Sequence, residues 1–451
     1  MFRPLLMLGC FCCVALPSLS QADEPVSFAK QVAPILIKNC QGCHGATDPK
    51  GDYRLHTFEL FMKAGESGQP AIAGKSLDNS YLYSLLIDED PDVRMPKDAK
   101  KLPDDQLALI RKWIEEGAKF DGPDLKATLT SFAPRPAHPL PPEIYPVAMP
   151  VTALAFRPDG KELAVGSYHE ITLWNPDDGK LVRRIQNVAE RTYGLAYNPD
   201  GKLLAAASGT PGQLGEVKLF NPQDGSLVKD LGATTDTAFH VAFSPDGKRL
   251  AACAADRSIR VFDVESGSQQ LLIEDHADWV MCISWSPDGK QLVSASRDKT
   301  SKVFNAENGE SQATYPGHGQ PVYAAVFSAD GKQILSAGGD KQVHVWNLSD
   351  GKRAANIGGY GGEVFGLLRV GDQLFSCSGD KTAKEHGAEK RNQVRIYAGH
   401  QDWVYAIDYN DPAKKLATGT YDGEVRIFNT TDGKEILKFK PAPGLPTTSI
   451  K

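Results

Sequence analysis

Apolar residues along the chain change their spacing near residue 150. Over residues 26–120 they recur every three to four positions, which is typical of amphipathic helices. From residue 150 to residue 440 they alternate with polar residues in short runs, which is typical of half-buried strands. The pattern predicts a small all-α domain followed by a larger all-β domain.

Three helices are expected in the all-α domain. The first begins after Ser27, whose side chain can cap it, and ends at Asn39. The second covers residues 79–87. The third begins at Asp104 as its cap and stops at Gly117.

The segment Cys40-Gln41-Gly42-Cys43-His44 directly follows the first expected helix. Two thiols one helical turn apart can bond the two vinyl groups of a haem, and the adjacent histidine is aimed at the iron. The same spacing also occurs by chance and in redox-active cysteine pairs. The helices on both sides of the motif, together with the export signal described below, favour covalent haem c on Cys40 and Cys43 with His44 as an iron ligand.

The second iron ligand decides what such a haem can do. Met95 is the leading candidate, because it lies in a loop bracketed by Pro91 and Pro96, and methionine there leaves no open site on the iron. His56 is an alternative ligand, and Met95 could instead fill a gap in the core. An open position would make the protein a sensor or a catalyst.

The α domain resembles a known family in several motifs. These are residues 32–36, 39–45, 50–51, 65–68, 71–72, 74, 80–82, 95–96, 110–114 and 117–118. They are similar to the planctomycete-type cytochrome c domain, and the similarity covers nearly all of residues 26–120. The resemblance implies one covalent haem c attached at Cys40 and Cys43, with His44 and Met95 as the axial iron ligands.

Residues 121–149 contain seven prolines, which cannot continue a helix. This composition predicts a semi-rigid linker between two domains.

The remaining chain, residues 150–440, repeats itself with a period of about 42 residues. Pro-Asp-Gly turns recur, or Ala-Asp-Gly in one unit, with their aspartates at Asp159, Asp200, Asp246, Asp288 and Asp330. Each unit contains four short alternating segments, and seven such units predict an all-β propeller of seven blades. The sixth unit is expected to be degenerate, because residues 385–390 spoil its third strand. Residues 441–451 form a tail.

Three histidines each precede an aspartate by 22 residues: His276 and Asp298, His318 and Asp340, and His400 and Asp422. The units resemble WD-repeat propellers over about 290 residues. In those propellers such a pair joins a serine or threonine and a third-strand tryptophan in a buried hydrogen-bond network. These histidines are therefore expected to be structural.

One rim of the propeller is expected to dock a protein partner, because exposed Trp, Tyr and Arg side chains carry much of the energy of interfaces. The expected rim residues are Tyr168, the stretch 208–215, Trp279, Arg297, Trp403 and Tyr421. In the central channel, the apolar first strands are interrupted by His240, Arg369 and Asp408. No catalytic residue is expected, since neither a nucleophile signature nor a metal-ligand spacing occurs there.

Residues 1–22 are expected to be a signal peptide cleaved after Ala22. Arg3 precedes an apolar stretch, residues 5–16, that is too short to cross a bilayer. A lipoprotein with its lipid on Cys10 is the alternative, although the residues before Cys10 are a poor context for lipid attachment. We expect export to the periplasm or cell envelope of a bacterium, with no membrane span.

Composition and charge narrow the function further. The expected signal peptide, residues 1–22, contains three of the eight cysteines. The remaining five are an odd number, which fits no simple disulfide framework. A net charge of -6 without a basic run argues against nucleic acid as a partner.

These observations predict an exported single-haem c-type cytochrome that transfers one electron at a time and docks to a redox partner protein through its propeller. Two alternatives remain open. One is a haem-containing oxidoreductase with a second cofactor in the propeller, and the other is a haem-based redox or gas sensor scaffold in the cell envelope.

Overall fold

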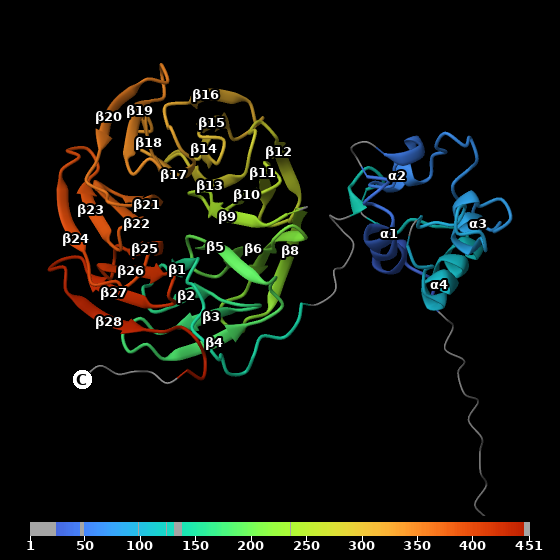
Figure 1. Cartoon of the computed structure of the whole chain (residues 1–451), viewed down its shortest axis with the longest axis horizontal. Helices are drawn as coiled ribbons and strands as arrows, with labels where there is room; N and C mark the ends of the chain where they lie inside the picture. Colours follow the sequence, from blue (N-terminus) through green and yellow to red (C-terminus); the bar gives the residue numbers. More distant parts are fainter. Residues whose placement is uncertain are drawn as a thin grey trace, which may run out of the picture. The chain divides into compact units, whose positions relative to one another are not determined.

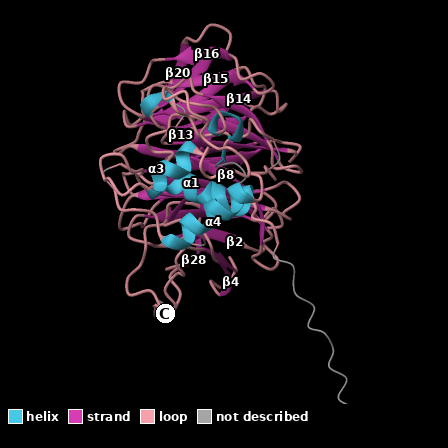
Figure 2. Ribbon diagram, turned by 90° about the vertical axis from the view of Figure 1, so that its right-hand side faces the viewer, coloured by secondary structure: helices cyan, strands magenta, loops and turns pink. Residues whose placement is uncertain are grey.

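The chain divides into two compact units, Met1–Arg135 and Pro136–Lys451. The computed structural model describes residues 24–45, 49–97, 99–122, 124–129, 138–234 and 236–445 (Figure 1). The expected signal peptide lies outside the described residues. Within the described residues, the helices belong to the first unit and the strands to the second. Figure 2 draws the helices in cyan and the strands in magenta.

The described part of the N-terminal unit contains short helices. They are η1 (Phe28–Val32), which runs directly into α1 (Ala33–Asn39), η2 (Lys50–Asp52), α2 (Phe58–Phe61), α3 (Tyr81–Ile87) and α4 (Asp104–Glu115). The Ser27 hydroxyl accepts a hydrogen bond from the Lys30 amide at 3.0 Å, as the capping prediction required. Pro103, rather than Asp104, is the N-cap of α4, so Asp104 lies in the first turn, where its charge complements the helix dipole. The four-residue helix α2 was not predicted.

Aromatic packing holds the first and last helices together. Phe28 contacts the ring of Phe58 edge-on at 4.6 Å between centroids and the ring of Trp113 at 5.3 Å. Trp113 is buried, and its indole N–H donates to the Lys119 carbonyl oxygen at 2.9 Å. This core fixes η1 and α4 beside each other, because buried aromatic side chains contribute large apolar areas and specific ring contacts.

The second unit is a propeller of seven four-stranded antiparallel sheets, which confirms the seven blades. Blades 1 to 3 contain β1 (Leu154–Phe156), β2 (Leu163–Gly166), β3 (Ile171–Trp174), β4 (Leu181–Ile185); β5 (Arg191–Tyr197), β6 (Leu204–Thr210), β7 (Leu214–Phe220), β8 (Leu227–Thr234); β9 (Ala238–Phe243), β10 (Arg249–Ala254), β11 (Ile259–Asp263) and β12 (Gln269–Ile273).

Blades 4 to 7 contain β13 (Val280–Trp285), β14 (Gln291–Ser296), β15 (Ser301–Asn305), β16 (Ser311–Tyr315); β17 (Val322–Phe327), β18 (Gln333–Gly338), β19 (Val343–Asn347), β20 (Arg353–Ile357); β21 (Val364–Val370), β22 (Gln373–Ser378), β23 (Ala383–Gly387), β24 (Gln393–Tyr397); β25 (Val404–Asn410), β26 (Lys415–Thr420), β27 (Val425–Asn429) and β28 (Glu435–Phe439). The first strand of each blade lies toward the channel and the fourth toward the outside of the ring (Figure 1).

The sixth blade is complete, which corrects the expectation that its third strand is spoiled. β23 pairs with both β22 and β24 along its length. Its central Glu385 is buried and accepts hydrogen bonds from Gln373 at 2.9 Å and from the Tyr397 hydroxyl at 2.8 Å. A charged residue fits this buried strand because both carboxylate oxygens have donors.

Each blade supplies its own four strands, so the ring closes through separate hydrogen bonds between blades 7 and 1, from side chains and from the backbone. The Phe156 amide donates to an Asp408 carboxylate oxygen at 2.6 Å, and the Asn410 amide group donates to the Arg157 carbonyl at 3.0 Å. The Val151 amide donates to the Thr420 carbonyl at 3.0 Å.

Both ends of the proline-rich segment contact a domain. On the N-terminal side, the Ala29 amide donates to the Asp121 carboxylate at 2.8 Å. On the propeller side, His138 lies 2.8 Å from Glu216, and the buried Tyr145 donates its hydroxyl to Glu170 at 2.6 Å. The prolines between residues 130 and 137 lie outside the described residues.

Candidate functional site

The cysteine motif coils into a turn at the end of α1. The Cys40 amide donates to the Leu36 carbonyl at 2.9 Å, which continues the helical pattern, and the His44 amide donates to the Cys40 carbonyl at 3.1 Å. Cys40 is half-buried, Cys43 is exposed, and both are free thiols. The turn therefore keeps the two thiols and the histidine on one short, hydrogen-bonded segment.

The imidazole of His44 has a fixed orientation. Its Nδ1 atom lies 3.2 Å from the carbonyl oxygen of Tyr53, and the two rings meet edge to face at 5.4 Å. Since a carbonyl oxygen can only accept, Nδ1 carries the proton and Nε2 is left with its lone pair for a metal. Tyr53 is itself held by a 2.8 Å hydrogen bond from its hydroxyl to the Phe61 carbonyl.

Met95 comes from a loop after α3. Its amide donates to the Leu85 carbonyl at 2.9 Å, so the backbone of this loop is tied to the helix. Its half-buried side chain packs against the core of the N-terminal unit. The thioether sulfur is thus carried by a loop with a fixed attachment point.

One cavity of about 580 Å³ brings these residues together. Cys40, Cys43, His44 and Met95 all line it, and its volume lies within the range of cofactor pockets. Apolar side chains form much of the remaining wall: Leu55, Ala71, Leu82, Leu85 and Leu86. Lys50 and Lys97 also border it.

The residues of this cavity fit a haem. A porphyrin needs apolar walls, two thiols on one edge and ligands for the iron, and all three kinds of group line the same space. Lys50 and Lys97 can bind the two propionate carboxylates. The fit rests on the chemistry of the whole set of lining groups rather than on any single residue.

The environment of Cys40 disfavours the thiolate form of this cysteine. Burial, and then the neighbouring Cys43, raise the pKa of the Cys40 thiol to about 12. Reactive pairs depend on a thiolate at neutral pH, which needs a lowered pKa.

His56, the alternative iron ligand, is not among the residues that line the cavity. Burial, and then the charge of Arg54, lower the pKa of its imidazole, and its Nδ1 atom is buried without a hydrogen-bond partner among the described residues. Its backbone carbonyl accepts from the Leu129 amide at 2.9 Å.

The buried histidine network is complete in blade 5. His318 lies 2.7 Å from Asp340 through Nδ1 and 2.8 Å from Ser336 through Nε2. The Trp346 indole N–H donates to the same serine hydroxyl at 3.2 Å. This is the network expected for His318, and it is structural in its contacts.

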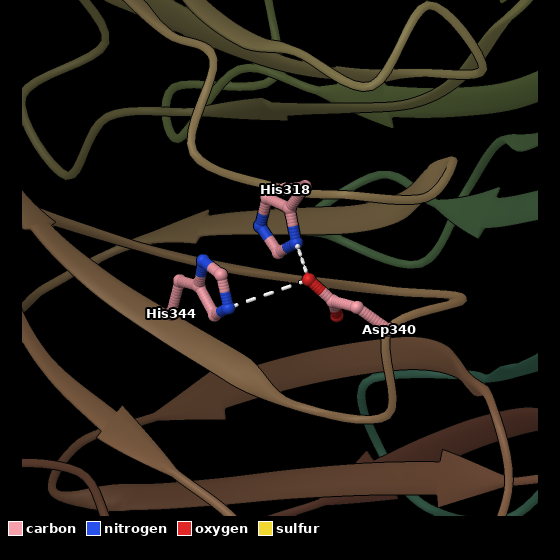
Figure 3. A group of neighbouring side chains, drawn as sticks. All are labelled: His318, Asp340 and His344. Atoms are coloured by element: carbon pink, nitrogen blue, oxygen red, sulfur yellow. Dashed lines mark hydrogen bonds and ion pairs between the residues drawn. The ribbon is translucent and has the colours of Figure 1, made fainter.

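Blade 5 also contains His344, which the spacing of the repeats did not indicate. Figure 3 shows that His318 and His344 both point to one oxygen of Asp340, and their rings stack at 4.0 Å. Three metal-ligating atoms come together here. Each ring nitrogen already has a protein partner, and that of Nδ1 in His344 is the Tyr315 hydroxyl at 2.9 Å. The cluster therefore belongs to the structural network.

The other two expected pairs differ from each other. In blade 4, His276 lies 2.7 Å from both Asp298 and Ser294, as expected. In blade 7, His400 contacts Thr418 at 2.9 Å, but its Nδ1 faces the Lys381 carbonyl at 3.2 Å rather than Asp422.

The expected bond between His400 and Asp422 is therefore wrong. A buried arginine of blade 7, Arg426, acts on His400, and its charge helps burial to lower the histidine's pKa to about 4. The Asp422 carboxylate instead accepts from the Thr420 hydroxyl. Sequence spacing alone could not distinguish this blade from blades 4 and 5.

The rim side chains are exposed at three of the expected aromatic positions. Trp279 is 36% exposed, Trp403 48% and Tyr421 50%. Tyr168 is half-buried. The stretch around 208–215 is the end of a long hairpin, because β6 and β7 each continue to it.

The sequence analysis missed a row of bulky side chains at the same end of the channel. Each is the residue at the β-bulge of a first strand: Tyr193, Met281, Tyr323, Phe365 and Tyr405. A bulge turns its residue out of the ladder. The recurrence of a bulky residue near the start of each of these first strands was a signal that could have shown them.

A second cavity, of about 770 Å³, occupies part of the central channel and includes His240, Arg369 and Asp408. Burial lowers the pKa of His240 to about 4 and raises that of Asp408 to about 7. Arg369 donates to the Gly371 carbonyl. The three polar groups come from blades 3, 6 and 7.

Comparison with known proteins supports both units. Residues 40–99 match the family model of planctomycete cytochrome C. Four stretches match the model of the WD domain, G-beta repeat: 225–263, 267–305, 309–347 and 391–429. Among the described residues, no helix is both long and apolar enough to cross a membrane.

Among curated proteins, subunit I of eukaryotic translation initiation factor 3 from Schizosaccharomyces pombe is 27% identical over 70 residues, which is 16% of this chain and 21% of that protein. The same subunit from Aspergillus fumigatus is 33% identical over 66 residues, which is 15% of this chain and 19% of that protein. The chain thus spans about a fifth of the length of these relatives. From the family models and the seven blades together, the chain combines a planctomycete cytochrome c domain with a propeller of WD repeats.

Proposed function

We propose that this protein is an exported c-type cytochrome that carries one covalent haem c, transfers single electrons and uses its propeller as a docking platform for a redox partner protein. The observation that carries this proposal is the single cavity bordered by Cys40, Cys43, His44 and Met95. Two thiols, an imidazole and a thioether on one apolar cavity are the groups that a six-coordinate haem c requires.

Four residues of the cavity would hold the haem, each by a different contact. Cys40 and Cys43 would form the two thioether bonds, and His44 would ligate the iron through Nε2, because Nδ1 donates to the Tyr53 carbonyl. Met95 would supply the second iron ligand from the loop whose backbone is bonded to Leu85. When bound, haem c supplies the one-electron carrier.

The remaining lining residues set the surroundings of the iron. Leu55, Leu82 and Leu86 exclude water from the site, and a methionine ligand raises the reduction potential while it occupies the last iron position. An occupied position favours electron transfer over gas binding or substrate chemistry.

The propeller's part in the proposal rests on its exposed rim. Trp279, Trp403, Tyr421 and Arg297 are side chains of the kind that dominate protein interfaces. A rigid ring of blades can present such side chains in fixed positions. Export to the periplasm or cell envelope is part of the proposal, and the signal-peptide pattern of residues 1–22 supports it.

The test is a visible spectrum of the reduced and oxidised full-length protein, made in a bacterial periplasm competent for haem attachment. We expect one haem that stays with the chain after denaturation, and no spectral change of the native protein with carbon monoxide. Cys40→Ala and Cys43→Ala should each weaken covalent attachment, whereas Cys253→Ala, at a buried thiol of the propeller, should not. Absence of covalent haem would overturn the proposal, and carbon monoxide binding would replace the electron carrier by a sensor or an enzyme.

A further inference from the structure

Blades 4 and 7 carry the same pair of residues, an aspartate followed by a tryptophan, directly before their first strands. The pairs are Asp278 with Trp279 and Asp402 with Trp403. In both, the tryptophan amide donates to the aspartate carboxylate at 2.8 Å. The two sites are therefore built alike from the backbone outward.

The neighbours of the two tryptophans also correspond. A phenylalanine from the preceding blade contacts each indole: Phe239 lies 5.5 Å from Trp279 and Phe365 lies 6.0 Å from Trp403. The residue across from each tryptophan donates its amide to the tryptophan carbonyl, at 2.9 Å from Arg297 and at 3.0 Å from Tyr421. Position 421 in blade 7 thus corresponds to position 297 in blade 4.

In blade 4 the site is filled by the protein's own arginine. The Arg297 guanidinium lies over the indole of Trp279, 4.3 Å from the ring centroid, and its Nε donates to Asp278 at 2.9 Å. The aspartate and the indole face together bind a guanidinium, because the carboxylate supplies charge and the indole supplies a cation–π surface.

In blade 7 the corresponding arginine is replaced by Tyr421. Among the residues that the structure describes, no ion pair reaches the Asp402 carboxylate. The adjacent cation, Lys381, donates to the Gln401 carbonyl at 2.8 Å instead. Trp403 is 48% exposed, against 36% for Trp279 beneath its arginine.

Two tyrosines surround this open site. Tyr421 lies 6.1 Å from Trp403, and Tyr405 lies 6.2 Å from Tyr421. Both tyrosines are exposed. We name Asp402, Trp403, Tyr405 and Tyr421 the blade 7 cup. It offers one carboxylate and three aromatic rings.

We propose that the blade 7 cup binds an exposed arginine side chain of the partner protein, in the arrangement that Arg297 adopts on blade 4. This inference rests on the docking role proposed for the propeller and names the chemistry of the docking group. Arginine is favoured over lysine because its planar guanidinium can stack on the indole while it donates to the carboxylate.

The probe for this proposal is the blocked tripeptide Gly-Arg-Gly, compared with Gly-Lys-Gly and with the neutral citrulline analogue. It is added to the full-length protein in its reduced form, and the indole N–H signals of the six tryptophans are followed by NMR. Trp403→Phe identifies the signal of Trp403. Trp279 is an internal control, since Arg297 already covers its ring.

We expect the arginine peptide to shift the Trp403 signal in a saturable way, at least fivefold tighter than the lysine peptide, and to leave Trp279 unmoved. Asp402→Asn should weaken binding about tenfold, while Asp278→Asn should not change it. Tyr421→Arg should weaken binding at least tenfold, because the chain then fills the cup as blade 4 does. Unshifted signals from the other tryptophans show that each variant is folded.

Equal binding of the citrulline peptide, or undiminished binding by Tyr421→Arg, would overturn the inference. The haem spectrum of the same sample separates this result from the proposed electron transfer. If the protein carries covalent haem but does not bind the arginine peptide, only the inference on the blade 7 cup is wrong. If it binds the arginine peptide but carries no covalent haem, only the proposed electron transfer is wrong.

Discussion

His44 and Tyr53 are joined through the backbone of the tyrosine rather than through its side chain: the imidazole Nδ1 faces the Tyr53 carbonyl oxygen at 3.2 Å. The hydroxyl of Tyr53 is used elsewhere, in its bond to the Phe61 carbonyl at 2.8 Å. Orientation of the proposed iron ligand therefore does not depend on the tyrosine hydroxyl.

Tyr53→Phe should leave the haem spectrum unchanged, because the carbonyl that orients His44 stays in place. The variant loses one part-buried hydrogen bond, so the free energy of unfolding should fall by about 1 kcal/mol. Visible spectroscopy and chemical denaturation measure the two effects. A displaced haem spectrum would mean that the ring, not the backbone, sets the histidine's position.

Met95→Ala should lower the reduction potential and make the reduced haem bind carbon monoxide, because the sixth iron position loses its thioether. Met62→Ala is the matched control, since Met62 packs against the same core but does not line the cavity. Potentiometric titration and a carbon monoxide difference spectrum measure both variants. An unchanged potential in Met95→Ala would reopen His56 as the ligand.

Trp346→Phe should lower the free energy of unfolding by about 2 kcal/mol, because it removes the donor to Ser336 and leaves a smaller ring in a buried site. Trp174→Phe in blade 1 should lower the free energy of unfolding by a smaller amount. The indole N–H of Trp174 is buried without a hydrogen-bond partner among the described residues, so phenylalanine relieves an unpaired donor there. Thermal unfolding compares the two, and equal losses would contradict the role assigned to the network.

Asp408→Asn should stabilise the propeller above pH 7. Burial raises the pKa of Asp408 to about 7, above its value in an unfolded chain, so the folded state binds an extra proton between about pH 4 and pH 7. Ionising the buried carboxyl lowers the stability of the folded state. This loss is absent below about pH 4, grows between pH 4 and pH 7, and levels off above pH 7 at no more than about 4 kcal/mol. The asparagine oxygen can still accept from the Phe156 amide.

The measurement is the melting temperature of wild type and variant at pH 4 and pH 8, with a gain expected only at pH 8. Asp411→Asn is the control, because the Lys414 ammonium beside Asp411 lowers that carboxyl's pKa, and its loss should bring no gain at pH 8. A gain at both pH values would show that ionisation of Asp408 is not its cause.

Local patterns predicted most of the elements and the number of blades, because turn residues and strand alternation act over a few positions and repeat in every unit. They also brought forward Cys40, Cys43, His44 and Met95, which line one cavity. The exceptions depend on contacts between distant segments. Glu385 fits a strand because Gln373 and Tyr397 donate to it, and His400 turns from Asp422 beside the buried Arg426. Neither effect is visible in spacing.

Each blade of this ring is one uninterrupted stretch of chain, and the ends of the ring meet through separate hydrogen bonds, which include those of Asp408, Asn410 and the Val151 amide. No sheet spans the junction between blades 7 and 1, so the propeller is a linear array of blades whose first and last members pack against each other. A whole unit of about 42 residues could be gained or lost by duplication or deletion without breaking a sheet. New termini could likewise be cut between any two blades, with the natural ends rejoined at the junction.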